Sequence, residues 1–323
     1  MRHLRSFTTL ALLLGLTQPL LAQDYPTHPV RILVQFPPGG VPDFSARLMA
    51  DQLSKALGQS FVVENRPGTG GNLATDVVAK STPDGYTLLL SASAPLAISP
   101  AIYKKLLFNV EKDFKPISLI ATFDFVMMAA PAFSPNTVAE IVELAKANPG
   151  KYNFASSGFG SEHHLSGELL NHAAGISLTH VPYKGFGPAT VDTMANHVQL
   201  MFGAVPAAMP FIKGGKLRPI ATTGSVRDKG LSDVPTFAES GYPQVKVISW
   251  VGLLAPAGTP QAVYDKLVAA SSKIIQSAEF VAQLRSFGVS TTPVGPKPMA
   301  ERIAADQTFW AKVVKDSAIK QVD

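Results

Sequence analysis

Apolar residues along this chain follow two spacings, one typical of buried strands and one typical of helices. Residues 30–34 form a short, β-branched apolar run, and apolar residues across 46–57 recur every three or four positions. This pattern predicts a strand followed by an amphipathic helix that Gly58 ends. Similar apolar runs occupy 60–64 and 86–91, and each leads into small polar residues. Three strand–loop–helix units in succession predict a parallel sheet with right-handed crossovers.

A second series of strands and helices occupies the middle of the chain. Two strand-like runs, 117–122 and 125–130, are divided by Phe123 and Asp124. Further strands are predicted at 152–155, 178–181, 198–202, 217–223 and, after a long loop, 249–254. The remaining residues are predicted to form two or three helices.

Two α/β series joined by two crossings of the chain predict two lobes with a cleft between them. We expect each lobe to be a mixed, mainly parallel sheet flanked by helices. Lobe 1 is expected to contain residues 23–123 and 248–323, and lobe 2 is expected to contain residues 124–247.

Small residues follow the ends of several predicted strands. In the first such loop, Pro37 and Pro38 stiffen the turn, while Gly39 and Gly40 have no Cβ atom to keep a ligand from the backbone. The carboxyl ends of parallel strands share one edge of a sheet, so these loops should gather there. Free N–H groups and the positive end of a helix dipole suit an anion, a carboxylate as well as a phosphate. The alternative is a tight turn whose glycines serve packing only.

The N-terminus has the pattern of a secretory signal peptide. Residues 1–5 are basic and 10–16 are apolar, and small residues precede Gln23. The apolar run is too short to span a bilayer, so we expect cleavage after residue 22 and no membrane insertion of the mature chain. The chain has no cysteine, which excludes disulfides and thiolate metal sites and fits export to a bacterial periplasm.

Composition and charge favour a globular protein and argue against nucleic acid as its partner. Charged residues make up 16% and apolar residues 46% of the 323 residues, as in a globular protein. Loss of the two arginines in the signal peptide would lower the formal charge from +5 to +3. That charge is too mild, and too evenly spread, to favour nucleic acid as a partner.

Motifs of common enzymes are missing from the sequence, which has no G-x-S-x-G, Walker or H-E-x-x-H motif. His163, His164 and His172 lie in one predicted helix at spacings that do not converge on a metal, so solvated or capping histidines are favoured. Ser156 and Ser157 could be nucleophiles, but no base and carboxylate stand in a recognisable pattern with them. We therefore expect no cofactor, no metal and no catalysis. The function that remains is the capture of an anion between the two lobes.

Seven motifs carry a family resemblance that extends over nearly all of the mature chain. In order, they are 36–40 with Asp43, 64–68, 83–88, 156–158, 180–185, 233–236 and 252–260. Together they resemble the Bug family of periplasmic solute receptors, which serve tripartite tricarboxylate transporters.

The resemblance implies a type II periplasmic-binding-protein fold with a two-strand hinge, a monomer that captures a small carboxylate and passes it to membrane transporter subunits. It implies that first-lobe loops hold the carboxylate largely through ordered waters, and that second-lobe loops hold it through N–H groups and hydroxyls. With the neighbouring loop positions, the predicted ligand-binding set is Phe36, Gly39, Gly40, Asp43, Gly71, Asn72, Ser91, Ser93, Ser156, Ser157, Gly158, Gly160, Ser161, Lys184, Gly203 and Ala204.

Several positions depart from the pattern of the family. Apolar Val41–Pro42 and Gly203–Val205 stand where relatives often have polar groups, and Glu162 with His163 interrupts a run of small residues. Phe123, Phe125 and Phe159 either add aromatic surface to the cleft or belong to the core. We expect aromatic or other apolar monocarboxylates to bind more tightly than citrate, aspartate or glutamate. Glu162 would repel a second ligand carboxylate unless His163 or Lys184 offsets its charge.

Two alternatives stay open. The receptor could report its ligand to a sensor kinase or chemoreceptor, since the sequence encodes only the binder. A secreted serine hydrolase using Ser156 or Ser157 is the third and least favoured hypothesis.

Overall fold

The computed structural model describes residues 25–291, 295–317, 319 and 321–322, so the expected signal peptide at 1–22 lies outside the described residues. The strands are β1 Val30–Val34, β2 Phe61–Asn65, β3 Thr87–Ala92, β4 Phe114–Ala129, β5 Asn153–Ser156, β6 Thr179–Pro182, β7 Leu200–Ala204, β8 Arg218–Thr222 and β9 Ile248–Pro256. The main helices are α1 Val41–Leu57, α2 Asn72–Ala79, α5 Val138–Ala147, α6 Glu162–Ala174, α7 Phe186–Met194, α8 Val205–Lys213, α9 Gln261–Ile275, α10 Ala278–Ser286 and α11 Pro296–Asp316. Short helical segments are η1 Thr69–Gly71, η2 Ala94–Ile98, α3 Ser99–Ile102 and α4 Val110–Asp113.

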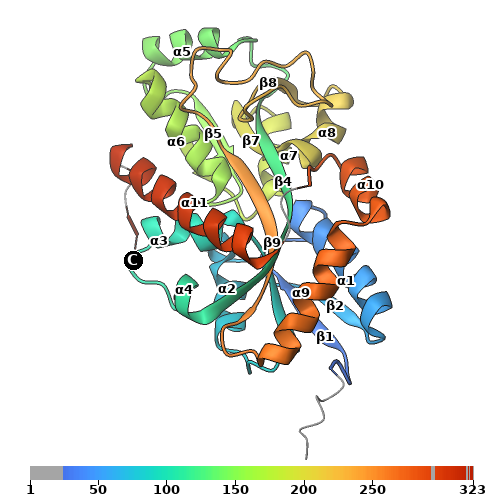
Figure 1. Cartoon of the computed structure of the whole chain (residues 1–323). Coiled ribbons are helices and arrows are strands. Elements are labelled where there is room, and N and C mark those ends of the chain that lie inside the picture. Colours follow the sequence, from blue (N-terminus) through green and yellow to red (C-terminus); the bar gives the residue numbers. More distant parts are fainter. Residues whose placement is uncertain (1–24, 292–294, 318, 320, 323) are drawn as a thin grey trace, which may run out of the picture.

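The strands form one continuous mixed sheet with two halves. In the first half, β1 pairs in parallel with β2 and β3, as the sequence predicts, and β9 is antiparallel to β3. In the second half, β5 pairs in parallel with β6 and β7, while β7 and β8 are antiparallel to β4. Every antiparallel pairing between these strands involves β4 or β9, so the mixed character of the sheet comes from the two strands that lie between the halves (Figure 1).

β4 is the strand that joins the halves, and here one expectation was wrong. The runs at 117–122 and 125–130 are not two strands but parts of the 16-residue strand Phe114–Ala129. Phe123 and Asp124, expected to divide them, pair with residues of β9 and so continue the ladder. From Phe125 onward β4 changes partners and pairs with β7 and β8. The polar Asp124 therefore marks a change of partner rather than a break.

After β8 the chain passes between the halves for a second time. This segment lies beside β4, and Thr223 ties the two together. The Thr223 hydroxyl donates to the Val247 carbonyl at 2.6 Å, and the Thr223 N–H donates to the Phe125 carbonyl at 2.9 Å. Two adjacent chain segments thus connect the halves, which is the two-strand hinge of the predicted fold class. The exact lobe limits stay a prediction.

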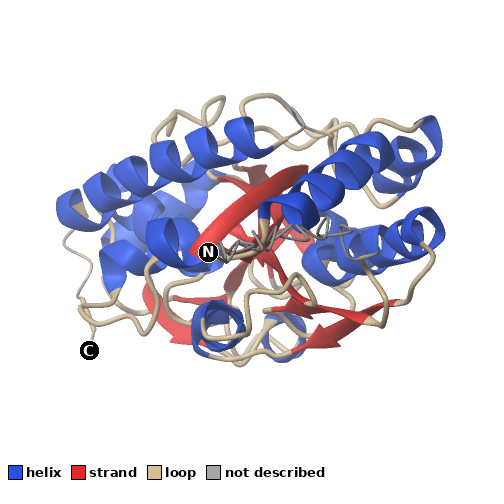
Figure 2. Ribbon diagram, turned by 60° about the horizontal axis from the view of Figure 1, so that its bottom comes forward, coloured by secondary structure: helices blue, strands red, loops and turns tan. Residues whose placement is uncertain are grey.

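The sheet is buried on both faces, with helices on each side (Figures 1 and 2). Alternate residues of β1 point to different cores, since Ile32 and Val34 belong to the large cluster and Leu33 to a second one. The helix predicted to follow β1 buries Met49 and Leu53 against the large cluster. Gly58 ends it in a left-handed conformation with φ of +73°.

Candidate functional site

A cavity of about 590 Å³ lies where loops from both halves of the sheet meet. The first half contributes the β1–α1 loop, and the second half contributes the N-terminal ends of α6, α7 and α8. The strand β4 passes along it at the point where the halves join. The lining residues are 36–42, Ala92, Phe123, Phe125, Ser157, Glu162, His163, 184–188, Ala204, Pro206, Ala207, Pro210, Phe211 and Phe287.

Four helices begin at this cavity. The lining includes Gly40 at the start of α1, Glu162 at the start of α6, Phe186 at the start of α7, and Pro206 in the first turn of α8. Neither α1, α7 nor α8 has a side-chain cap on its N-terminus. Uncapped N–H groups and the positive ends of helix dipoles favour a negative charge at this point.

Asp43 lies beneath the β1–α1 loop rather than on the cavity wall, and it is only 5% exposed. Its Oδ2 accepts hydrogen bonds from the Gly39 N–H at 3.0 Å and from Arg47 Nε at 3.1 Å. Its Oδ1 accepts from Asn65 Nδ2 at 2.9 Å, and the same amide donates to the Phe36 carbonyl at 3.0 Å. Burial alone would raise the pKa of Asp43, but hydrogen bonds from Arg47, Gly39 and Asn65 lower it below its usual value.

These bonds give Asp43 the role of holding the loop. Phe36, Gly39 and Gly40 do line the cavity, as predicted. The Gly39 N–H is already occupied by Asp43, whereas the Gly40 N–H has no hydrogen-bond partner among the described residues. Gly40 has φ of −89°, and a Cβ atom there would meet only Pro42 Cδ, at 3.7 Å. The turn itself therefore does not require a glycine at residue 40.

The other predicted residues of the first half lie behind the cavity wall. Gly71 is a packing glycine, since a Cβ there would lie 2.6 Å from Pro95 Cγ. Ser91 is fully buried and bonds to Gln35 and to the Ala92 carbonyl. Asn72 is 8% exposed, and neither of its side-chain polar atoms has a partner among the described residues. Ser93 reaches the site indirectly, through Glu162.

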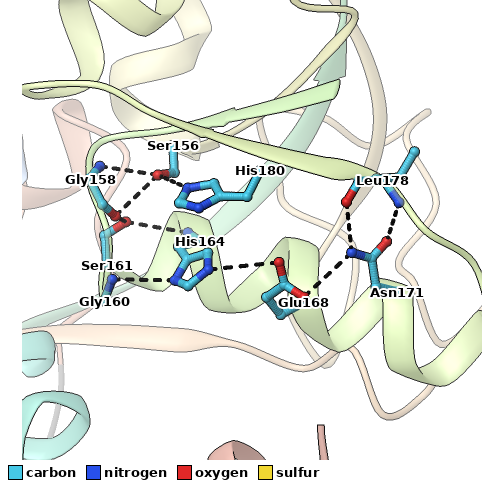
Figure 3. Close-up of polar contacts among 9 residues, drawn as sticks. All are labelled: Ser156, Gly158, Gly160, Ser161, His164, Glu168, Asn171, Leu178 and His180. Atoms are coloured by element: carbon cyan, nitrogen blue, oxygen red, sulfur yellow. Dashed lines mark hydrogen bonds and ion pairs between the residues drawn. The ribbon is translucent and has the colours of Figure 1, made fainter. Parts of the chain in front are cut away.

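The loop after β5 is held from below by two histidines (Figure 3). Ser156 Oγ lies 2.6 Å from His180 Nε2 and accepts from the Gly158 N–H, and Ser161 Oγ donates to the Gly158 carbonyl. The Gly160 N–H donates to His164 Nδ1 at 3.3 Å, which leaves the ring proton on Nε2, 3.7 Å from Glu168 Oε1. Of the loop residues predicted to bind ligand, only Ser157 lies on the cavity wall.

The expectation of solvated or capping histidines holds in part: His172 is exposed and His164 caps the turn before α6 by accepting from the Gly160 N–H, but solvation does not hold for His163 and His164. His164 is 4% exposed, and His163 lines the cavity. Burial lowers the pKa of His163 and of His180 to about 4, and burial together with His180 lowers the pKa of His164 to about 3. All three rings are therefore neutral at pH 7. Among the described residues no cluster of three or more metal-ligating side chains is present.

Ser156 has a base that sequence reasoning missed, because His180 lies 24 residues away. The pair is nevertheless turned away from the cavity. Ser156 is fully buried, and the His180 ring stacks on the rings of His164 at 3.9 Å and Phe154 at 5.1 Å, with no hydrogen bond to a carboxylate among the described residues. The hydroxyl thus serves to fix the loop.

Glu162 is an acidic residue on an otherwise mostly apolar wall. It is 6% exposed, and its Oε1 accepts hydrogen bonds from Ser93 Oγ at 2.6 Å and Ser249 Oγ at 2.8 Å. Within the part of the chain that the structure describes, it forms no ion pair. Lys184 lies on the same wall, is exposed and has no partner among the described residues.

Aromatic rings form much of the remaining wall. Phe123 and Phe125 line the cavity, whereas Phe159 does not and packs on His164 instead. Sequence reasoning missed three further rings, Phe186 at the start of α7, Phe211 in α8 and Phe287 directly after the end of α10. Gly203 lies behind Phe186, because a Cβ at residue 203 would be 2.4 Å from that ring, while Ala204 reaches the wall itself.

A mixed sheet in two halves, joined by two strands and enclosing a ligand-sized cavity between their loops, defines a two-lobed solute-binding protein. The chain belongs to the tripartite tricarboxylate transporter family of receptors, whose family model matches residues 45–319. The resemblance to Bug receptors and the predicted fold class are therefore confirmed.

Individual relatives agree with this family. BugT of Bordetella pertussis is 36% identical over 307 residues, covering 95% of this chain and 94% of the relative. The solved structure of Rhodopseudomonas palustris Rpa4515 with adipate has a TM-score of 0.88 at 33% identity, covering 93% of this chain and 100% of that one. MatC (Rpa3494) from Rhodopseudomonas palustris with bound malate has a TM-score of 0.84 at 32% identity, covering 90% and 100%. No described helix is long and apolar enough to cross a membrane.

Proposed function

We propose that this protein is a periplasmic receptor that captures a small carboxylate in the cavity and delivers it to a membrane transporter of the tripartite tricarboxylate type. The observation that carries the proposal is the meeting of four helix N-termini at one cavity bounded by both halves of the sheet. Such a site favours an anion without needing a buried arginine. The adipate and malate in the two related structures support a carboxylate as that anion.

Binding is proposed to close the two lobes on the ligand. The lobes are residues 23–123 with 248–323 and residues 124–247, and they turn about the crossings that Thr223 ties together. A ligand that touches loops of both lobes binds the closed state better, and so shifts the population toward it. The transporter would recognise the closed form.

The walls favour an apolar ligand body. Six phenylalanines and six prolines line the cavity, and the prolines among them, such as Pro42 and Pro206, offer no hydroxyl to a ligand. A citrate hydroxyl would be buried there without a partner, at a cost of a few kcal/mol. Ring-on-ring contact with a bound aromatic acid could add about 0.5–1.5 kcal/mol per pair. Aromatic or alkyl monocarboxylates are therefore proposed to bind more tightly than citrate, aspartate or glutamate.

A thermal-shift panel of mono- and dicarboxylates, aliphatic and aromatic, followed by calorimetry, tests the binding role. A ligand at a hundred times its Kd should add about 2.7 kcal/mol to the free energy of unfolding. No stabilisation by any carboxylate would contradict the proposal. Uptake of the best ligand should then be lost in a deletion strain. Normal uptake with a lost chemotactic or transcriptional response would instead indicate a sensing role.

A further inference from the structure

Glu162 places a carboxylate inside a cavity that otherwise suits an anion. Its backbone begins α6, so the positive end of that helix favours its negative charge. Both hydrogen bonds to the side chain come from neutral hydroxyls, those of Ser93 and Ser249, and both end on the same oxygen, Oε1. In the described residues Oε2 has no hydrogen-bond donor, and the residue lies on the cavity wall.

No described side chain of the wall neutralises this charge. The neighbouring His163 is partly buried, and the lowered pKa of its ring keeps it uncharged at pH 7. Lys184 is the cation among the described residues of the wall, and it forms no ion pair with Glu162. Oε2 of Glu162 is not among the fully buried side-chain atoms, so this oxygen is open to the cavity, where a donor or a cation of a ligand can reach it.

The two charges also differ in their surroundings. Lys184 is exposed and lies next to the start of α7, close in sequence to Gly185 and Phe186. Glu162 is almost fully buried and shares the wall with Phe123 and Phe125, where β4 crosses between the halves. A ligand carboxylate is therefore attracted by Lys184 and by the uncapped N-termini of α1, α7 and α8, whereas a second carboxylate that approached Glu162 would meet a charge of its own sign.

This inference rests on the proposed function. We propose that the ligand is a carboxylate whose far end carries a protonated amine that pairs with Glu162, the two groups being separated by an apolar body. Glu162 then acts as a specificity-determining residue that accepts an ω-amino acid and rejects a dicarboxylate of the same length. The neutral Ser93 and Ser249 hold its side chain in place for that contact.

A matched set of ligands tests this without altering the protein. Hexanoate, 6-aminohexanoate and adipate share one body and differ only at the far end, as do 4-methylbenzoate, 4-(aminomethyl)benzoate and terephthalate. Calorimetry on the unmodified chain should show the amine binding at least about tenfold more tightly than the methyl compound in at least one set, the range expected for a hydrogen bond to a charged group. The dicarboxylate should bind most weakly in both sets.

The isosteric variant Glu162→Gln assigns the effect to this residue. It should bring the amine and the methyl compound to within about threefold of each other and improve the dicarboxylate about tenfold. Glu143→Gln removes one charge from an exposed position of α5 and should leave the ranking of the unmodified chain intact. A melting curve and the Kd for the methyl compound show whether each variant is folded.

The possible failures are distinguishable. If the methyl compounds or the dicarboxylates bind but the amines bind no better, the inference is overturned and the carboxylate receptor stands. The inference is likewise overturned if Glu162→Gln leaves the preference for the amine unchanged. If no compound of either set, nor any acid of the wider panel, binds, then the proposed function fails and the inference fails with it.

Discussion

Removal of the Asp43 carboxylate should weaken ligand binding although this residue does not touch the cavity. In Asp43→Ala, the Gly39 N–H loses its acceptor, and Asn65 Nδ2 keeps only its bond to the Phe36 carbonyl. The lost pair with Arg47 counts for little, because that guanidinium is 54% exposed. The unsatisfied donors should cost about 1–3 kcal/mol, and loosening of the loop should raise the Kd by about five- to 150-fold.

Urea unfolding gives the stability change and calorimetry gives the Kd. Asp51→Ala is the matched control, because it removes an exposed carboxylate from the same helix and loses only surface contacts such as the pair with Lys55. It should change both quantities by less than about 0.5 kcal/mol. If Asp43→Ala binds ligand as well as the parent chain does, the loop does not depend on this tie. If it binds better, Asp43 acts as a repulsive charge near the ligand and not as a support for the loop.

Three further predictions concern the same site. Gly40→Val should abolish ligand binding at unchanged stability, because the backbone conformation of residue 40 is allowed for any residue and the added methyl groups block access to the loop. An unchanged Kd in calorimetry would show that the loop has only a structural role. Burial lowers the pKa of His180 to about 4. Between about pH 6.5 and pH 4, the unfolded chain therefore binds more protons than the folded chain. The contribution of His180 to the free energy of unfolding, present at pH 7, should fall as the pH drops and be lower by about 2 kcal/mol at pH 5. His180→Asn should make the slope of unfolding free energy against pH shallower between pH 7 and 5, and an unchanged slope would contradict this reasoning. Gly203→Val should displace the Phe186 ring, lowering Tm and raising Kd together, and a lowered Tm with normal Kd would show that the ring is not part of the ligand contact.

Much of the first half of the fold followed from local sequence. The β-branched run of β1, the three- and four-residue spacing in α1 and the left-handed Gly58 are all short-range signals, so they predicted a strand, a helix and its end. The motifs that resemble the Bug family added the family and the two-lobed fold class. The break expected at Phe123 and Asp124 was wrong, because the partner of β4 at these residues is β9, which lies more than a hundred residues away in the chain.

The ligand-binding set was a mixture of wall residues and residues behind the wall. Loops at the carboxyl ends of strands do gather at one edge, and that general rule brought Gly40, Ser157 and Ala204 to the cavity. The sequence could not tell which polar groups of those loops are already bonded. Ser156 contacts His180, 24 residues away, and Asp43, which accepts from Gly39, is held by Asn65, 22 residues away, so packing between elements sets these bonds.

The sequence by itself determined the local elements, the anion-suited loops and the family. Only the tertiary structure decided the chemistry of the cavity wall. It keeps His163 and His164 in neutral form and brings Phe287, which follows α10, to the same wall as Phe186 and Phe211 of α7 and α8. It also placed Glu162 against the hydroxyls of Ser93 and Ser249. The physical reason is that hydrophobic spacing reports which face of an element is buried, whereas charge, protonation and access depend on what the other elements place against that face.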